Sequence, residues 1–158
     1  MISKQYLAGF IDGEGNISLR KFKTNTGYGI KFRIVLRVTN TNKDILEQMK
    51  LQYGGQIEKT IKEGTRLPES KNWKDCFRWV ISDKKATVVL KDVHKYLILK
   101  KEQSRCCLEL AKMSKKLKAK RMKNGYFVKA SKKEVIKKLE LFEIVKKLNI
   151  KGKGFLGA

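Results

Sequence analysis

The chain has 158 residues, and its 38 Lys and Arg against 15 Asp and Glu give a formal net charge of +23. This length favours a single domain. So large a positive charge disfavours compactness unless a polyanion binds, which makes nucleic acid the first partner to consider. No apolar run approaches the ~20 residues that span a membrane, so we expect no membrane partner.

The first predicted element is a helix over residues 4–12, for which Ser3 is a suitable N-cap. Gly9 and Gly13 lie one turn apart on the same helical face, where missing side chains let another backbone approach closely. Gly13 and Gly15 then favour a stop to the helix. The pattern therefore predicts a tightly packing helix that carries Glu14 to the end of its contact face.

Two alternating segments follow, over residues 17–22 and 29–39, and predict a pair of strands. The second strand has one apolar face, made by Phe32, Ile34, Leu36 and Val38. Its other face carries Lys31, Arg33, Val35 and Arg37, and the outward set on the first strand is Ser18, Arg20 and Phe22. One face suits a core and the other suits phosphates or base edges.

The pattern Thr41-Asn42-Lys43-Asp44 predicts a capped helix that ends near Tyr53. Strands are expected over 56–62 and 72–81, followed by helices over 83–96 and 101–114. The lysine-rich segment 115–129 is expected to be an irregular basic arm. Ser131 and Glu134 form a capping box for a last helix, which Gly152 and Gly154 end.

Residues Leu7 to Gly15 resemble the motif of the LAGLIDADG homing endonucleases, with Glu14 at the final acid. The predicted element order also resembles the αββαββα core of that family, an α+β fold with a four-stranded antiparallel DNA-binding sheet. The resemblance extends over residues 1–114, and 115–158 match only as a basic, helical C-terminal extension. Residues 1–158 are accordingly expected to form one endonuclease domain.

The resemblance implies a sequence-specific endonuclease that makes a double-strand break in a long pseudo-palindromic DNA site. One motif per chain implies a homodimer, whose interface is expected at Leu7, Gly9, Phe10 and Gly13. Two facing Glu14 carboxylates would repel each other unless a cation lies between them. The resemblance implies two or three Mg²⁺ ions per dimer, bound by Glu14 and the Gly13 carbonyl, and Mg²⁺ can activate water.

The resemblance also implies roles for residues outside the motif. Lys100, with Lys101 as the nearby competitor, would polarise water or stabilise charge on the phosphate. Asn40 would position water, and Asp12 would support the helix end. The basic residue expected four places after Asn40 is absent, because Asp44 stands there. The expected DNA-binding residues are Ser18, Arg20, Phe22, Lys31, Arg33, Arg37, Gln56, Glu58, Thr60, Lys74 and Arg78.

Other interpretations of the sequence remain open. A ribosomal or chromatin-type packing protein would explain the charge alone. Glu69-Ser70-Lys71 weakly suggests a PD-(D/E)xK nuclease, but no upstream Asp has the right strand context and Pro68 favours a loop there. The same fold can also serve as an intron RNA-splicing maturase or as an inactive DNA-binding protein. The joint presence of Glu14, Lys100 and Asn40 favours an active enzyme over these two.

Cysteine usage indicates the cellular compartment. Cys76, Cys106 and Cys107 have no metal-ligand spacing, and an odd count argues against a disulfide framework. We therefore expect an intracellular protein. A composition rich in lysine and poor in proline suits a chloroplast, a mitochondrion or a prokaryotic cytoplasm.

Overall fold

A computed structural model describes residues 1–23, 30–60, 75–119 and 130–150. Its elements are α1 (Lys4–Glu14), β1 (Gly15–Lys23), β2 (Ile30–Asn40), α2 (Lys43–Tyr53), β3 (Gln56–Thr60), β4 (Cys76–Ser82), α3 (Asp83–Val93), the 3₁₀ helix η1 (His94–Tyr96), α4 (Lys101–Ala119) and α5 (Lys132–Leu148). The predicted α+β order is confirmed.

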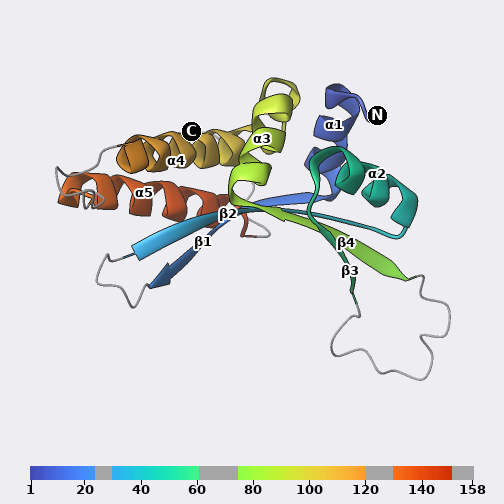
Figure 1. Cartoon of the computed structure of the whole chain (residues 1–158), viewed down its shortest axis with the longest axis horizontal. Coiled ribbons are helices and arrows are strands. Elements are labelled where there is room, and N and C mark those ends of the chain that lie inside the picture. The colour runs from blue at the N-terminus through green and yellow to red at the C-terminus, as the bar shows by residue number, and fades with distance from the viewer. Residues whose placement is uncertain (24–29, 61–74, 120–129, 151–158) are drawn as a thin grey trace.

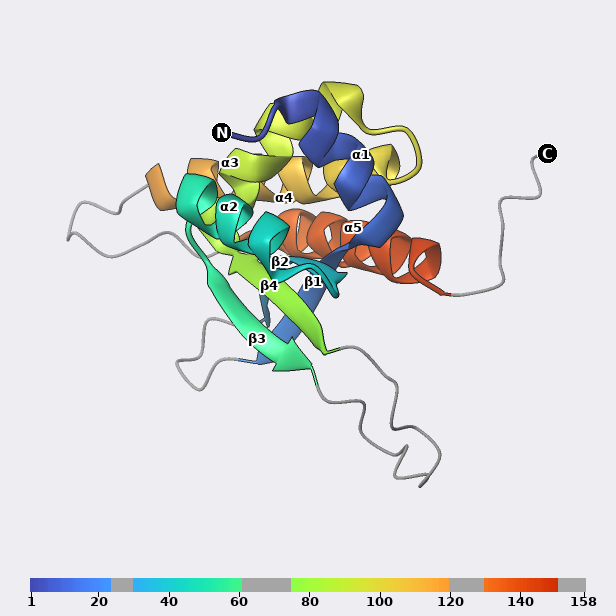
Figure 2. The ribbon, with the colours of Figure 1, turned by 90° about the vertical axis from the view of Figure 1, so that its right-hand side faces the viewer.

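The four strands form one antiparallel sheet in the order β1-β2-β4-β3. The helices cover one face of this sheet, and the two strand pairs splay apart on the other side (Figure 1). The view turned by 90° shows the same one-sided arrangement, with no helix on the lower face (Figure 2). The described part of the chain therefore leaves one sheet face open for a ligand.

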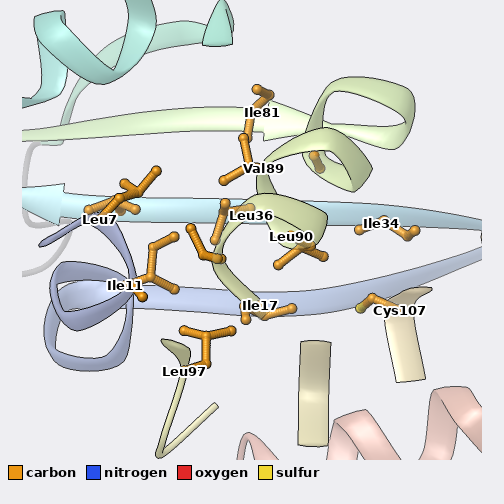
Figure 3. Packing of buried hydrophobic residues seen from close by; sticks show 14 of the residues in the cluster. Leu7, Ile11, Ile17, Ile34, Leu36, Ile81, Val89, Leu90, Leu97 and Cys107 are labelled. Atoms are coloured by element: carbon orange, nitrogen blue, oxygen red, sulfur yellow. The ribbon is translucent and has the colours of Figure 1, made fainter. Parts of the chain in front are cut away.

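Strand periodicity explains which side chains enter the core. Leu36 and Val38 are fully buried, as are Ile17 on β1 and Trp79 on β4. Leu7, Ile11 and Leu90 from α1 and α3 pack onto this layer (Figure 3). Alternation with period 2 sends the intervening residues to the open face, so the face assignment made from the sequence is confirmed.

The junction between α1 and β1 needs glycine. Gly15 is the C-cap of α1, and a Cβ built on it would lie 2.5 Å from the carbonyl oxygen of Ile11. No real side chain tolerates that distance from backbone, so the chain can pass directly from helix to strand only with glycine here. Glu14 is thereby fixed in the last turn of α1, two residues beyond the predicted helix end.

Two local predictions are corrected. Asn42, not Thr41, caps α2, because the Asn42 Oδ1 accepts hydrogen bonds from the backbone N–H groups of Asp44 and Ile45. Helix α4 continues to Ala119, so residues 115–119 are helical rather than an irregular arm; lysine is a good helix former. The remaining arm residues 120–129, the strand residues 61–62 and 72–74, and Gly152 and Gly154 lie outside the described residues.

The C-terminal helices form a pair beside β1. Ser131 and Glu134 make the predicted capping box of α5, and Lys137 on α5 forms an ion pair with Glu109 on α4 at 2.8 Å. The side-chain amide of Asn149 donates to the carbonyl oxygen of Ile17 at 2.9 Å. These contacts attach the extension to the same core that carries the sheet.

Candidate active site and nucleic-acid interface

The open face of the sheet is hollowed into a groove. Its lining comes from the end of α1 and from strands β1 to β4. The lining residues are Glu14, Asn16, Arg20, Arg33, Val35, Arg37, Thr39, Glu58, Arg78, Val80 and Ser82. Five of the predicted DNA-binding residues are among them, and they share the groove with the predicted catalytic acid.

Strand register places these side chains in rows across the groove. Arg20 lies opposite Arg33 in the β1–β2 pair. Arg78 on β4 lies opposite Thr39 on β2 and opposite Glu58 on β3. Because paired residues on one face stand close together, the groove concentrates four arginines from three strands.

Arg37 shows the electrostatic consequence of this crowding. Its side chain is half-buried, and desolvation lowers the pKa of its guanidinium, with repulsion from Arg20 and Arg78 acting in the same direction and Glu58 opposing it. Arginine stays charged in proteins, so this repulsion persists in the free chain. A polyanion in the groove would relieve it.

The other predicted DNA-binding residues differ in whether their polar groups already form hydrogen bonds within the chain. The Ser18 hydroxyl donates to the carbonyl oxygen of Val35, and the Thr60 hydroxyl donates to that of Cys76. Gln56, Lys31 and Phe22 are exposed on the same face, beyond the groove lining. Lys74 lies outside the described residues.

Asp12 connects the end of α1 to the segment before α4. Its carboxylate oxygens accept hydrogen bonds from the backbone N–H groups of Ile98, Leu99 and Lys100, at 2.7, 3.2 and 2.9 Å. Three such bonds use most of the acceptor capacity of the carboxylate. The expected structural role of Asp12 agrees with these contacts, and Glu14, unlike Asp12, lines the groove.

Lys100 is brought next to the motif by this same arrangement. Its Nζ donates to the backbone carbonyl oxygen of Asp12. Burial lowers the pKa of Lys100, while the carboxylates of Asp12 and Glu14 act in the opposite direction. A lysine that is partly desolvated beside an acid can respond to charge that develops nearby.

We expect Lys100→Met to slow single-turnover DNA cleavage more than it weakens DNA binding, because Lys100 lies beside Glu14 rather than in the groove lining. The neighbouring Lys101→Met variant is the control, since Lys101 is exposed in the first turn of α4. Equal losses of binding and of cleavage rate would show that Lys100 only contacts backbone phosphate.

The structure does not bring Asn40 into the groove. Its Oδ1 accepts a hydrogen bond from the backbone N–H of Asn42 at 2.8 Å, at the start of α2. Thr39 and Asn16 line the groove instead. Alternation could have identified Thr39, because residues 33, 35, 37 and 39 share one face of β2.

One residue that the sequence predicts on the exposed face of α1 lies in the core instead. Leu7 is fully buried in the core, on the α1 stripe that faces the sheet, so it cannot contact a partner and is removed from the expected interface. Gly9 and Gly13 are exposed, and a Cβ added at either would meet no atom within 4 Å. Tyr6 and half-buried Phe10 flank these glycines, and their rings stack with centroids 5.9 Å apart.

A metal site is not complete in the described part of one chain. No group of three or more His, Cys, Asp or Glu side chains there could hold a metal ion. The oxygen donors near the motif include the exposed Glu14 carboxylate and the backbone carbonyls of the last helical turn. Hard oxygen donors of this kind suit Mg²⁺.

None of the described helices is both long enough and apolar enough to cross a membrane.

Comparisons with known proteins identify the same fold. The structure of I-CvuI in complex with the I-CreI target DNA and Mg is 18% identical, with a TM-score of 0.68, over 96% of this chain and 84% of that chain. The archaeal intron-encoded homing endonuclease I-Vdi141I, solved with DNA, is 19% identical with a TM-score of 0.67, over 98% and 88%.

A third structure, the LAGLIDADG homing endonuclease I-GzeII with its DNA target, is 15% identical with a TM-score of 0.63, over 90% of this chain and 44% of that chain. No curated protein matches the sequence. The model of the LAGLIDADG endonuclease family matches residues 7–74. Residues 7–74 are thus similar to the LAGLIDADG endonuclease family, and the chain has the fold of these homing endonuclease structures.

Proposed function

We propose that this protein is a sequence-specific, Mg²⁺-dependent homing endonuclease that cuts both strands of a pseudo-palindromic DNA site as a homodimer. One observation carries the proposal. Glu14 stands where the exposed glycine face of α1 meets the basic groove, so a pair of chains would align two carboxylates with one continuous DNA surface. Two β-sheets of this kind can enter the major groove on either side of the cleavage point.

Dimerisation through α1 follows from the open face around Gly9 and Gly13. Nothing within the described residues packs there, although glycine inside a helix destabilises it by about 1 kcal/mol relative to alanine. A second copy of α1 gives a reason for both glycines, because two backbones can then approach closely. The proposed interface consists of Gly9, Gly13, Phe10 and Tyr6, with Leu7 excluded.

The residues present fit Mg²⁺ when two chains are considered together. Each chain would supply the Glu14 carboxylate and the Gly13 carbonyl, and two facing carboxylates favour a divalent cation between them. When bound, the metal activates water and stabilises the leaving oxygen of the phosphodiester. Lys100 would steady charge on the phosphate, and Asp12 would hold Lys100 in place through its backbone N–H.

A cleavage selection tests the proposed function. Wild-type protein is incubated with a randomised pseudo-palindromic DNA library and Mg²⁺, and cut molecules are sequenced. We expect one family of symmetric sites with breaks in both strands. An RNA-splicing maturase or an inactive DNA-binding protein would yield no cut molecules in this selection.

DNA affinity is expected to depend steeply on salt, because the groove arginines and neighbouring lysines replace counterions on the phosphates. With roughly ten phosphates engaged, affinity should fall by about 10³-fold or more between about 50 and 200 mM salt. Fluorescence anisotropy across a salt series measures the slope. A nearly flat response would contradict the assignment of the basic sheet face to DNA.

A further inference from the structure

Arg33 is held by two side chains on the open face of the sheet. Its Nε lies 3.3 Å from Oδ2 of Asp83, and its guanidinium carbon lies 5.5 Å from the ring centroid of Phe22. Phe22 is the diagonal neighbour of Arg33 in the β1–β2 register, where long side chains can meet. The aromatic face and the carboxylate together restrict both the plane and the rotation of the guanidinium.

The backbone places Asp83 at this point. Strand β4 ends at Ser82, which lies opposite Val35, two residues from Arg33. Asp83 has a φ of 53° and is the one non-glycine residue with positive φ in the described ranges. Aspartate and asparagine tolerate this left-handed conformation better than most residues. The turn from β4 into α3 thus projects a carboxylate beside an arginine of the groove.

Asp83 contacts Arg33 through Nε, so the two terminal amino groups of Arg33 take no part in this ion pair. No described residue accepts a hydrogen bond from its two terminal amino groups, so these remain available to a ligand in the groove. Two parallel N–H donors match O6 and N7 of guanine in the major groove. The ion pair is about half exposed on both sides, at 53% and 52%, and such pairs add little stability. The effect of this ion pair is instead to restrict the orientation of the Arg33 guanidinium.

We propose that Arg33 reads one guanine in each half-site, with Asp83 as its positioning residue and Phe22 as the platform for its guanidinium. This inference rests on the proposed DNA-binding function and adds a base identity to it. Arg78 offers a contrast, because a neutral hydroxyl, Oγ1 of Thr39, faces its Nε at 3.4 Å. Glu58 lies opposite Arg78 in the β3–β4 register, but among the described residues only Arg33 of these two forms an ion pair.

The test compares the base preferences of three variants of the full chain with those of wild type. A library of randomised DNA duplexes is bound without cleavage, in Ca²⁺, and the bound molecules are sequenced. Arg33→Met locates the base pair, where preference for guanine should fall by about tenfold or more. Asp83→Asn keeps the tolerance for positive φ and removes the charge. It should weaken preference at that same base pair by about 2- to 10-fold, the cost of immobilising a long side chain on binding.

Asp75→Asn is the matched control. Asp75 forms an exposed ion pair with Lys59 at 2.7 Å, and Lys59 alternates away from the Glu58 face of β3. Both substitutions to asparagine raise the net charge by one, so both should strengthen binding to all sequences similarly. Only Asp83→Asn should change a base preference, and neither should lower the melting temperature.

Three results would overturn the inference. If Arg33→Met leaves every base preference unchanged, Arg33 reads no base. If Asp83→Asn matches wild type at the base pair that Arg33→Met identifies, Asp83 does not position the arginine. A wild-type protein that binds no member of the library refutes the proposed function itself, and the inference with it.

Discussion

Replacing Glu14 with glutamine is expected to abolish DNA cleavage by orders of magnitude and to leave DNA binding almost unchanged. Glutamine keeps the shape and hydrogen-bonding capacity of the side chain but removes the charge that attracts a divalent cation. Binding is expected to rest mainly on the arginines that line the groove, which lie on β1, β2 and β4. Loss of two like charges near the dimer axis should also stabilise the metal-free dimer slightly.

The measurement is a single-turnover cleavage assay in Mg²⁺, paired with a binding titration on the same DNA. Glu47→Gln is the control: Glu47 lies on α2, where it forms an ion pair with Lys43 at 3.3 Å, and it lines no part of the groove. The same comparison separates the alternative functions, since a maturase or a DNA-binding protein does not need Glu14. Normal Mg²⁺-dependent cutting by Glu14→Gln would refute the catalytic assignment.

Much of the sheet and its basic face follows from alternation. The pattern in 29–39 assigns Leu36 and Val38 to the core and Arg33 and Arg37 to the open face, and the structure agrees. This works because period 2 leaves only two faces and one of them is strongly apolar. The same rule should have placed Thr39 in the groove. The family resemblance favours Asn40 instead, but Asn40 is one residue later in β2, and its Oδ1 accepts a hydrogen bond from the backbone N–H of Asn42.

Helix faces are harder to assign because the motif is apolar nearly all round. Tyr6, Leu7, Phe10 and Ile11 offer two possible stripes, and periodicity alone does not say which one meets the sheet. Leu7 and Ile11 are buried, whereas Tyr6 is 53% exposed. The sequence also gives no local signal for the contact between Asp12 and residues 98–100, which are more than 80 positions away along the chain.

Because Leu7 and Ile11 form the buried stripe of α1, the opposite side of the helix is exposed. The proposed role of this exposed side in dimerisation can be tested. Gly9 occupies the exposed side, next to Phe10, and space around it is empty within the described chain. A substitution there changes nothing inside the monomer except the helix itself. Because leucine has a better helix propensity than glycine by somewhat under 1 kcal/mol, the isolated fold should become no less stable.

Gly9→Leu is therefore expected to dissociate the dimer while it preserves the monomer fold. Two leucines where the α1 helices of the two chains cross would hold these helices apart. Cleavage of both DNA strands should then disappear, and affinity for the full pseudo-palindrome should fall toward the affinity for a half-site. Analytical ultracentrifugation at micromolar protein, with and without DNA, measures the mass, and circular dichroism measures the fold. Lys91→Leu, at an exposed position of α3, controls for added surface hydrophobicity and should remain dimeric. A wild-type chain that sediments as a monomer both with and without DNA, or a Gly9→Leu variant that remains a fully active dimer, would refute association through α1.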